Sequence, residues 1–275
     1  MINYIYKKMK LITLFSLILI STNILSQNVG QKGDTLKNYR DINGFKQGRW
    51  EKPYKNGKIA YKAYFVNDKL VGDYLRFYSN GELMLKIKYD KNQSGYATLY
   101  WDTGKKMAEG KYINTNVKDS VWQFYGIDEA LMATETYKNG IRNGLSKNFY
   151  RNGKTSEEIN WENGKKNGIW RKYYDNGKTR METRYINNQL DGIFHVFYKN
   201  GRMYINGGYK ADLKNGIWNF YDKQGKLTKT IEYINGIATN QNELDSIENA
   251  MIKEWESQKG KFAEPDVNKF FNPRR

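Results

Sequence analysis

Cysteine is absent from the 275 residues of the chain, and histidine occurs only once. The first absence excludes disulfide bonds, thiolate metal sites, a cysteine nucleophile and a lipid anchor attached through cysteine. Proline is also rare, with three residues, whereas tyrosine (23) and glycine (25) are abundant. Because such a mixture of rings and turn formers is typical of short strands joined by tight turns, we predict an all-β protein.

Long hydrophobic runs are lacking as well, with one exception near the N-terminus. Lys7, Lys8 and Lys10 precede a ten-residue apolar stretch, Leu11 to Ile20, and a more polar stretch ends in Ser26. This order is typical of a secretory signal peptide. Ten residues are too few to span a bilayer as a helix, which takes about 20. We therefore predict cleavage near Ser26, export to the periplasm or the exterior, and no transmembrane segment in the mature chain.

The balance of charge is strongly basic, with a formal net charge of +17. Residues 1–26 hold three lysines and no acid, so the mature chain carries 17 − 3 = +14, whether translation starts at Met1 or at Met9. A basic surface attracts polyanions such as nucleic acid, anionic lipid or acidic glycan. Salt screens this attraction, which carries no specificity, so a basic surface without a polyanionic partner stays an alternative.

A glycine followed, in most copies, by a large aromatic residue two positions later recurs along the chain. These marker glycines are Gly48, Gly72, Gly95, Gly144, Gly168, Gly192 and Gly216, with Ser120 in their place in the fourth copy. They are 24 residues apart, except for one interval of 23 and one of 25. A second glycine follows nine residues later, except at Glu129, and an aromatic residue follows seventeen residues later in all eight copies. Three shared registers define eight repeats.

Two polar turns fold each repeat into two antiparallel strands. In the segment 174–178, Asn176-Gly177 stands between two strand-like runs, which predicts a type I turn with a glycine bulge. About ten residues later, a second polar pair such as Asn163-Gly164 turns the chain into the next repeat. The array is therefore expected to form one elongated, twisted, antiparallel sheet.

The second strand of each repeat alternates apolar and polar residues, which predicts one buried face. In the second repeat, Leu85, Ile87 and Tyr89 share that face. If the first turn holds four residues, Gly168 lies opposite Tyr185. We then expect the tyrosine ring to cover the bare glycine backbone, an arrangement known as aromatic rescue.

The first strands carry rings on both faces, and the second row of rings is our candidate binding site. This ring row lies five residues after the marker residue in the second to eighth repeats, on the face opposite to Trp50 and its equivalents. Its members should follow one another at about 9.6 Å, two strand spacings, interleaved with lysine and arginine. The alternative is that these rings pack on neighbouring rings or on a second layer. The ring row comprises Phe77, Tyr100, Tyr125, Phe149, Tyr173, Phe197 and Tyr221.

The two ends of the array are expected to differ from its middle. Residues 27–43 form a leader and a half repeat with a lone strand around Leu36 to Ile42, and the eight repeats occupy residues 44–236. Residues 237–275 form a capping helix that starts at Asn240 and ends near Gly260, followed by a loose tail. The helix would cover the last sheet edge, or else dock a partner. Its apolar stripe is Leu244, Ile247, Met251 and Trp255.

The pattern Gly-x-Trp-x-x-x-Tyr-x-Asn-Gly-Lys, as in Gly168 to Lys178, resembles the MORN-repeat variant of bacterial proteins. Many of these proteins are grouped as YwqK-type antitoxins of toxin–antitoxin systems. The resemblance covers roughly Asp41 to Gly236. It implies a row of β-hairpins used for protein or lipid contact, and it implies no catalytic residues. An export signal would suit an antitoxin only if its toxin acts in the envelope.

The residues that could carry catalysis or bind a metal are few. His195 stands at a variable, mostly polar register, which indicates an ordinary surface histidine rather than a base or a ligand. Glu157 and Glu158 are adjacent on a strand and should point to opposite faces, which is wrong for an acid/base pair. The Gly-Lys pairs end hairpins rather than open helices, so they lack a phosphate-binding helix N-terminus. We predict no enzyme activity, no cofactor and no metal.

Binding is therefore the function class that the sequence supports. We predict a non-catalytic exported scaffold that binds a protein partner or an anionic lipid or glycan of the envelope along its sheet. The alternatives are an antitoxin or immunity-type protein and a cell-wall carbohydrate-binding module, in which rings stack on sugars. Nucleic acid would suit the charge and the rings equally, but the predicted export argues against it.

Overall fold

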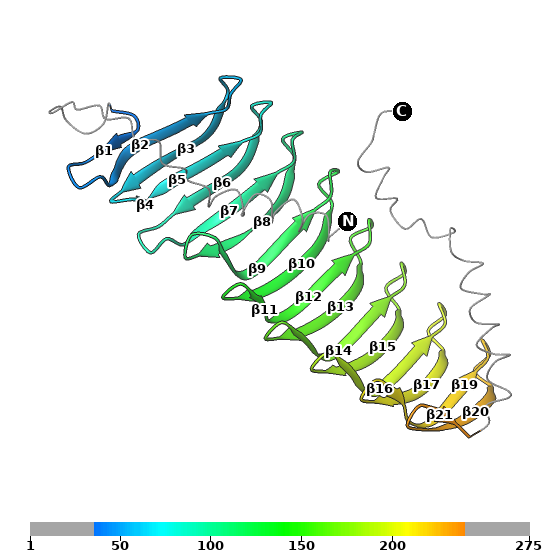
Figure 1. The fold of residues 1–275 in the computed structure, drawn as a ribbon. Helices are drawn as coiled ribbons and strands as arrows, with labels where there is room; N and C mark the ends of the chain where they lie inside the picture. Colours follow the sequence, from blue (N-terminus) through cyan, green and yellow to red (C-terminus); the bar gives the residue numbers. More distant parts are fainter. Residues whose placement is uncertain (1–35, 240–275) are drawn as a thin grey trace. The chain divides into compact units, whose positions relative to one another are not determined.

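The computed structural model describes residues 36–239, which form 21 β-strands and no helix (Figure 1). The all-β prediction is confirmed for this part of the chain. The predicted signal peptide, capping helix and tail lie outside the described residues. Between residues 36 and 239 there is accordingly no helix with the length and apolarity to cross a membrane.

Each repeat contributes two long strands, and shorter strands flank some of the turns. The long strands are β2 (Lys46–Pro53), β3 (Ile59–Val66), β5 (Gly72–Phe77), β6 (Leu83–Tyr89), β7 (Gly95–Tyr100), β8 (Lys106–Ile113), β9 (Val117–Tyr125), β10 (Leu131–Lys138), β12 (Gly144–Phe149), β13 (Thr155–Glu162), β14 (Lys165–Tyr173), β15 (Thr179–Ile186), β16 (Gln189–Phe197), β17 (Met203–Lys210), β19 (Gly216–Tyr221) and β20 (Leu227–Ile234). The two-residue strands are β1 (Tyr39–Arg40), β4 (Lys69–Leu70), β11 (Ile141–Arg142), β18 (Leu213–Lys214) and β21 (Ile237–Ala238).

The described residues belong to two compact units. The first unit holds residues 36–155 and 161–164, and the second unit holds residues 156–160 and 165–239. Within the first, strands β1 to β10 and β12 pair antiparallel with their neighbours, and within the second, strands β14 to β21 do the same. The predicted lone strand before the first repeat is β1, in which Tyr39 pairs with Gln47.

The first turn of the sixth repeat has the predicted geometry. The amide of Gly177 donates to the carbonyl of Tyr174 at 2.9 Å, and the amide of Tyr174 donates to the carbonyl of Lys178 at 2.8 Å. Gly177 has a φ of +91°, in the left-handed region that glycine adopts at little cost. The same pair of backbone bonds forms at Tyr54, Tyr78, Trp101, Gly126, Tyr150, Tyr198 and Asp222.

In every repeat except the second, the second turn is a two-residue turn with two left-handed residues. Asn139 and Gly140 have φ values of +50° and +82°, as a type I′ hairpin turn requires, and Asn187 and Asn188 have +51° and +75°. Each such turn also bonds to the preceding repeat. The amide of Gly140 donates to the carbonyl of Lys118 at 2.7 Å, and equivalent bonds start at Asp68, Thr115, Gly164, Asn188, Asp212 and Gly236.

The predicted register between the marker residues and the aromatic residues seventeen positions later is confirmed. Gly168 pairs with Tyr185, as expected. The same pairing joins Gly48 to Phe65, Gly72 to Tyr89, Gly95 to Tyr112, Ser120 to Tyr137, Gly192 to Tyr209 and Gly216 to Tyr233.

The backbone conformation of Gly168 gives a reason for the marker glycine that the sequence prediction did not include. A Cβ atom built on Gly168 would approach Asn160, and no atom of Tyr185 is among its nearest contacts. The ring of Tyr185 instead lies 5.6 Å from the ring of Trp170. Gly168 has a φ of +108°, so the position needs glycine because its backbone is left-handed.

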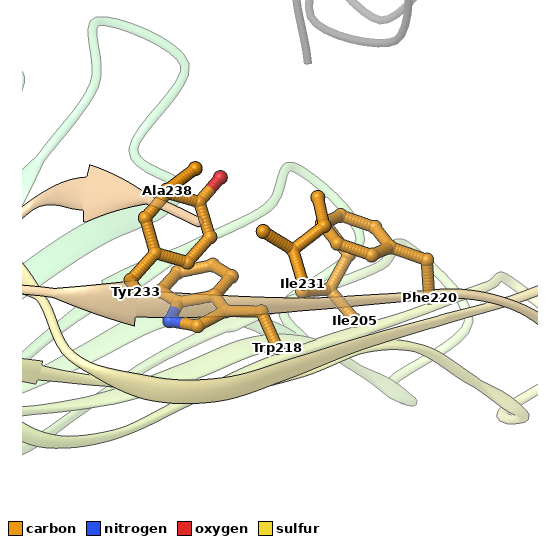
Figure 2. Close-up of a cluster of buried hydrophobic side chains, with 6 residues drawn as sticks. All are labelled: Ile205, Trp218, Phe220, Ile231, Tyr233 and Ala238. Carbon is orange, nitrogen blue, oxygen red and sulfur yellow. The ribbon is translucent and has the colours of Figure 1, made fainter. Parts of the chain in front are cut away.

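The apolar core lies on the face that carries the tryptophans. In the second unit it is a cluster of buried side chains that project from one side of the strands (Figure 2). Trp218 is 2% exposed, and its ring lies 5.3 Å from those of Phe194 and Tyr209 and 5.6 Å from that of Tyr233. A Cβ atom on Gly207 would overlap this ring. The absence of a side chain at position 207 is what makes room for the indole.

Replacing Gly207 by alanine is therefore expected to destabilise the protein by about 1–3 kcal/mol, because the added methyl displaces the indole of Trp218. Without the indole, alanine would stabilise the strand relative to glycine, because glycine weakens a strand interior. A loss of stability would therefore identify overpacking as the cause. Chemical denaturation followed by circular dichroism measures it. In a W218L background the cost should shrink, and an equal cost in both backgrounds would contradict this explanation.

Candidate functional site

The two faces of the strands differ in chemistry, and we call them the tryptophan face and the open face. On the tryptophan face, the aromatic residue two positions after a marker packs on the aromatic residue seventeen positions after it. The ring centroids of Trp50 and Phe65 are 6.0 Å apart, and those of Phe194 and Tyr209 are 5.3 Å apart. This face is the packed side of the sheet.

Lysines on the tryptophan face are held by the protein's own rings, which the sequence prediction missed. In the sixth repeat, the Nζ atom of Lys166 lies 5.2 Å from the ring of Trp170 and 4.9 Å from that of Tyr185. Lys46, Lys118 and Lys214 make the same pair of contacts in their repeats. A cation above a ring face is attracted by its quadrupole. These four lysines are therefore already partnered within the chain.

The co-occurrence of two residue types was the available sequence signal for this contact. Lysine stands two positions before the marker in all four repeats that have tryptophan two positions after it. Where the ring is smaller, the residue two positions before the marker is leucine: Leu70 accompanies Tyr74, and Leu190 accompanies Phe194. This co-occurrence indicates that the lysine stands at this position because it contacts the indole.

The fourth repeat places a buried charged cluster on the tryptophan face. Glu135 accepts hydrogen bonds from Arg142 at 2.8 Å and from the hydroxyl of Tyr137 at 2.5 Å, and Arg142 lies 4.8 Å from the ring of Trp161. Burial raises the pKa of Glu135. Burial, together with the charge of Arg142, lowers the pKa of Lys118 to about 7. The cluster satisfies its own charges, so we assign it a structural role.

The ring row lies on the open face, where the sequence placed it. All seven rings are half-buried. The hydroxyl of Tyr125 donates to Glu109 at 2.5 Å, that of Tyr173 donates to Glu158 at 2.7 Å, and the ring of Phe197 lies 6.3 Å from that of His195. Within each unit there is one sheet, so the alternative of a second layer does not apply to the described residues.

Two tyrosines of the ring row, Tyr125 and Tyr173, are fixed by carboxylates and remain protonated. Burial, with the hydrogen bond to Glu158, raises the pKa of Tyr173 to about 12. Burial and Glu109 likewise raise the pKa of Tyr125 above its ordinary value. Both phenols are therefore neutral donors at physiological pH, and their hydrogen bonds hold the rings in one orientation.

Two further rows accompany the ring row on the open face, and the sequence prediction overlooked both. The apolar row lies one position after the marker and includes residues as exposed as Ile217 (61%) and Val121 (50%). The donor row lies three positions after the marker and is half-buried. The apolar row comprises Tyr96, Val121, Leu145, Ile169, Ile193 and Ile217. The donor row comprises Thr98, Gln123, Lys147, Arg171, His195 and Asn219.

The remaining predictions about individual side chains have mixed outcomes. Glu157 accepts a hydrogen bond from the indole of Trp170, and Glu158 accepts one from Tyr173, so these neighbours do point to opposite faces. His195 pairs with Glu182 on one side and Asn206 on the other, and it is half-buried rather than freely exposed. Within residues 36–239, no three side chains of the metal-binding types gather into a site.

Together these features define an antiparallel β-hairpin repeat protein whose open face repeats three kinds of side chain. Five segments match the family described as the MORN repeat variant, which confirms the repeat resemblance at residues 46–67, 70–91, 142–163, 166–187 and 214–235. The match concerns the repeat alone, and repeats of this family are in general not enzymatic. The antitoxin grouping is a separate statement, which stays a prediction. A comparison with curated proteins gives no significant match.

Solved structures resemble the chain only distantly. A crystal structure of a mutant of S. aureus TarM with fondaparinux, alpha-GlcNAc-glycerol and UDP is 17% identical, with 35% of this chain and 19% of that chain covered and a TM-score of 0.27. A second TarM structure is 18% identical over 34% and 19%, with the same score. A TcdB2-TccC3-Cdc42 structure is 8% identical over 70% and 15%, with a score of 0.17. The chain spans less than a fifth of each, and scores this low carry no argument about function.

Proposed function

We propose that the chain is a non-catalytic, exported repeat scaffold that binds a protein partner or an anionic envelope component through its open face. The observation that carries this proposal is the recurrence of aromatic rings and of exposed apolar residues at the same two positions of successive repeats. A sheet that needed only solubility could fill these two positions with any polar residue. Exposed apolar residues in a row, rather than singly, are typical of interaction surfaces.

The tryptophan face supports the proposal by contrast. Its rings pack on one another, and four of its lysines lie over those rings. A partner that used this face would have to displace contacts that the chain already makes. The open face offers its rings half-exposed, and carboxylates hold two of them, Tyr125 and Tyr173, so binding there costs little reorganisation.

The proposal is tested by binding of the purified, labelled protein to a cell-envelope fraction. A triple variant of the ring row (Y173S, F197S, Y221S) should bind at least about tenfold more weakly, because interface rings are frequent hot spots. The control changes three exposed apolar residues outside the rows of the open face (L227S, I234S, I237S) and should bind like the wild type. Equal binding of wild type and ring-row variant would contradict the proposal.

Two treatments of the same assay distinguish the classes of partner. Protease digestion of the envelope should abolish binding if the partner is a protein. Raising NaCl to a few hundred millimolar should weaken binding to an anionic component, because salt screens exposed charges. Binding that survives both treatments would indicate ring stacking on a glycan, as in a carbohydrate-binding module.

A further inference from the structure

We infer that the open face binds a polyproline II segment of a partner protein, which lies across the strands with one turn on each repeat. This inference rests on the proposed function and names the backbone conformation of the partner. Three observations on the open face lead to it: the spacing of the rows, the hydrogen-bonding character of the donor row, and the overlap of all three rows in six repeats.

The spacing of the repeats matches the pitch of a polyproline II helix. Equivalent residues of successive repeats are two strands apart, which corresponds to about 9.6 Å. A polyproline II helix has three residues per turn and rises by about 3.1 Å per residue, so one turn spans about 9.3 Å. Every third residue of such a segment therefore meets the same position of the next repeat.

Other peptide conformations fit this spacing less well. An α-helix rises by about 1.5 Å per residue, so its two turns, seven residues in all, span about 10.5 Å. Its side chains would therefore lose register with the repeats faster than those of a polyproline II helix. An extended strand alternates its side chains at about 3.3 Å per residue, so three residues later the side chain points away from the sheet. A threefold helix is the conformation that keeps one side chain per repeat on the surface.

The chemistry of the three rows complements such a segment. Proline side chains and other apolar groups pack on aromatic-lined grooves, which the ring row and the apolar row supply on either side. The two rows are four residues apart along the strand, about 13 Å, and the donor row lies between them, where it can reach the backbone of a segment that contacts both. The backbone carbonyls of a polyproline II segment form no internal hydrogen bonds, and proline has no amide hydrogen. All six side chains of the donor row carry N–H or O–H groups.

The positive charges of the donor row also favour a segment whose backbone is rich in hydrogen-bond acceptors. Lys147 and Arg171 are cationic, and both belong to the row over which the backbone of the bound segment would lie. Arg171 keeps further N–H groups beyond the one that contacts Glu182 at 2.9 Å. The donor row is therefore complementary in charge to a backbone rich in acceptors and poor in donors.

The three rows overlap in six repeats, and the ring row extends into the second repeat with Phe77. The row residues of repeats three, four and five lie in the first unit and those of repeats six, seven and eight in the second. The first two repeats depart, with Arg49 and Asp73 in the apolar row's position and Glu51 and Leu75 in the donor row's position. Three repeats in each unit correspond to about nine residues of a polyproline II segment per unit.

The inference is tested with two labelled peptides of twelve residues and the full chain. One peptide consists of four Leu-Pro-Pro triplets, and the other has the same composition with its leucines irregularly spaced. We expect the triplet peptide to bind at least about tenfold more tightly in fluorescence anisotropy. Equal affinities, or no binding of the triplet peptide, would overturn the inference.

A matched pair of variants locates the binding surface. Ile217 is 61% exposed in the apolar row, and Ile234 is 58% exposed outside the rows. I217N should weaken binding of the triplet peptide by about tenfold, and I234N by less than about twofold. Similar losses in both variants would place the peptide elsewhere and overturn the inference, and circular dichroism checks that both variants fold.

The peptide assay and the envelope assay separate the two proposals. If the ring-row variant loses envelope binding and the triplet peptide does not bind, the scaffold proposal holds and the polyproline conformation is wrong. If an oligosaccharide of β-1,4-linked N-acetylglucosamine binds in place of the peptide and depends on Ile217, the open face is a glycan site and the inference is wrong. If the peptide binds but envelope binding is unchanged in the ring-row variant, the proposed function fails.

Discussion

Replacing Trp218 by alanine is expected to lower the free energy of unfolding by about 3–5 kcal/mol, the range for truncation of a large buried ring. The indole is 2% exposed, stacks with Phe194 at 5.3 Å, and donates from Nε1 to the carbonyl of Gly208 at 3.1 Å. It also lies 5.2 Å from the Nζ atom of Lys214. Alanine would remove all of these contacts and leave a cavity. Urea denaturation followed by circular dichroism measures the loss.

The neighbouring residue supplies the control for this prediction. Ile217 is 61% exposed on the opposite face, so I217A should change stability by no more than about 0.5 kcal/mol. A cost of W218A below about 1 kcal/mol would show that the tryptophan face does not carry the core. Because stability in repeat proteins is distributed over neighbouring units, hydrogen exchange should place the largest loss of protection around β19 and β20.

Stability should rise with pH between about pH 7 and 10 because of Lys118. Burial lowers the pKa of this lysine to about 7, whereas an unfolded lysine has a pKa near 10.5. Within this window the folded lysine is neutral and the unfolded lysine is charged, so unfolding takes up a proton and becomes harder as pH rises. The slope has an upper limit of about 1.4 kcal/mol per pH unit. Below pH 7 both states are charged, and the penalty of burying the charge is fully present.

The K118M variant isolates this contribution. Methionine keeps the apolar stem over Trp122 and Tyr137 but cannot titrate, so the stability curve of K118M should be flatter than that of the wild type. A residual slope of the same sign should remain, since burial also lowers the pKa of Lys46. Denaturation at several pH values below 10 measures the difference. A constant gap between wild type and variant across this range would refute the assignment.

The sequence was sufficient to predict the turns and the register, because these depend on local backbone conformation. Glycine or asparagine at positions such as Gly177 and Asn139 identifies left-handed residues, and the distance between the turns fixes which residues pair. The prediction for Gly168 had the correct pairing with Tyr185 but did not include its left-handed backbone. Pattern identifies left-handed residues in tight turns, but it does not identify one within a strand, and it does not show where a ring turns.

Less of the candidate site was predictable. The ring row followed from the aromatic residues, which stand out in any alignment of the repeats. The apolar row did not, because isoleucine or valine on a strand is ordinarily taken as a sign of burial, and the exposure of Ile217 depends on which face is covered. The contact of Lys166 with Trp170 and Tyr185 was hidden for another reason. A basic residue is usually read as a solvated charge, and its place over two rings requires coordinates.

The backbone bonds between successive second turns have a consequence for the evolution of the chain. The amide of Gly140 reaches the carbonyl of Lys118, and the same backbone bond forms at the second turn of every repeat except the second, where the side chain of Gln93 donates to the carbonyl of Leu70 instead. Junctions that share this bond are alike in their backbone, so duplication or loss of a whole repeat between them leaves the same bond at the new junction. The length of the sheet then depends on the number of repeats, so added repeats would extend the surface for a longer ligand.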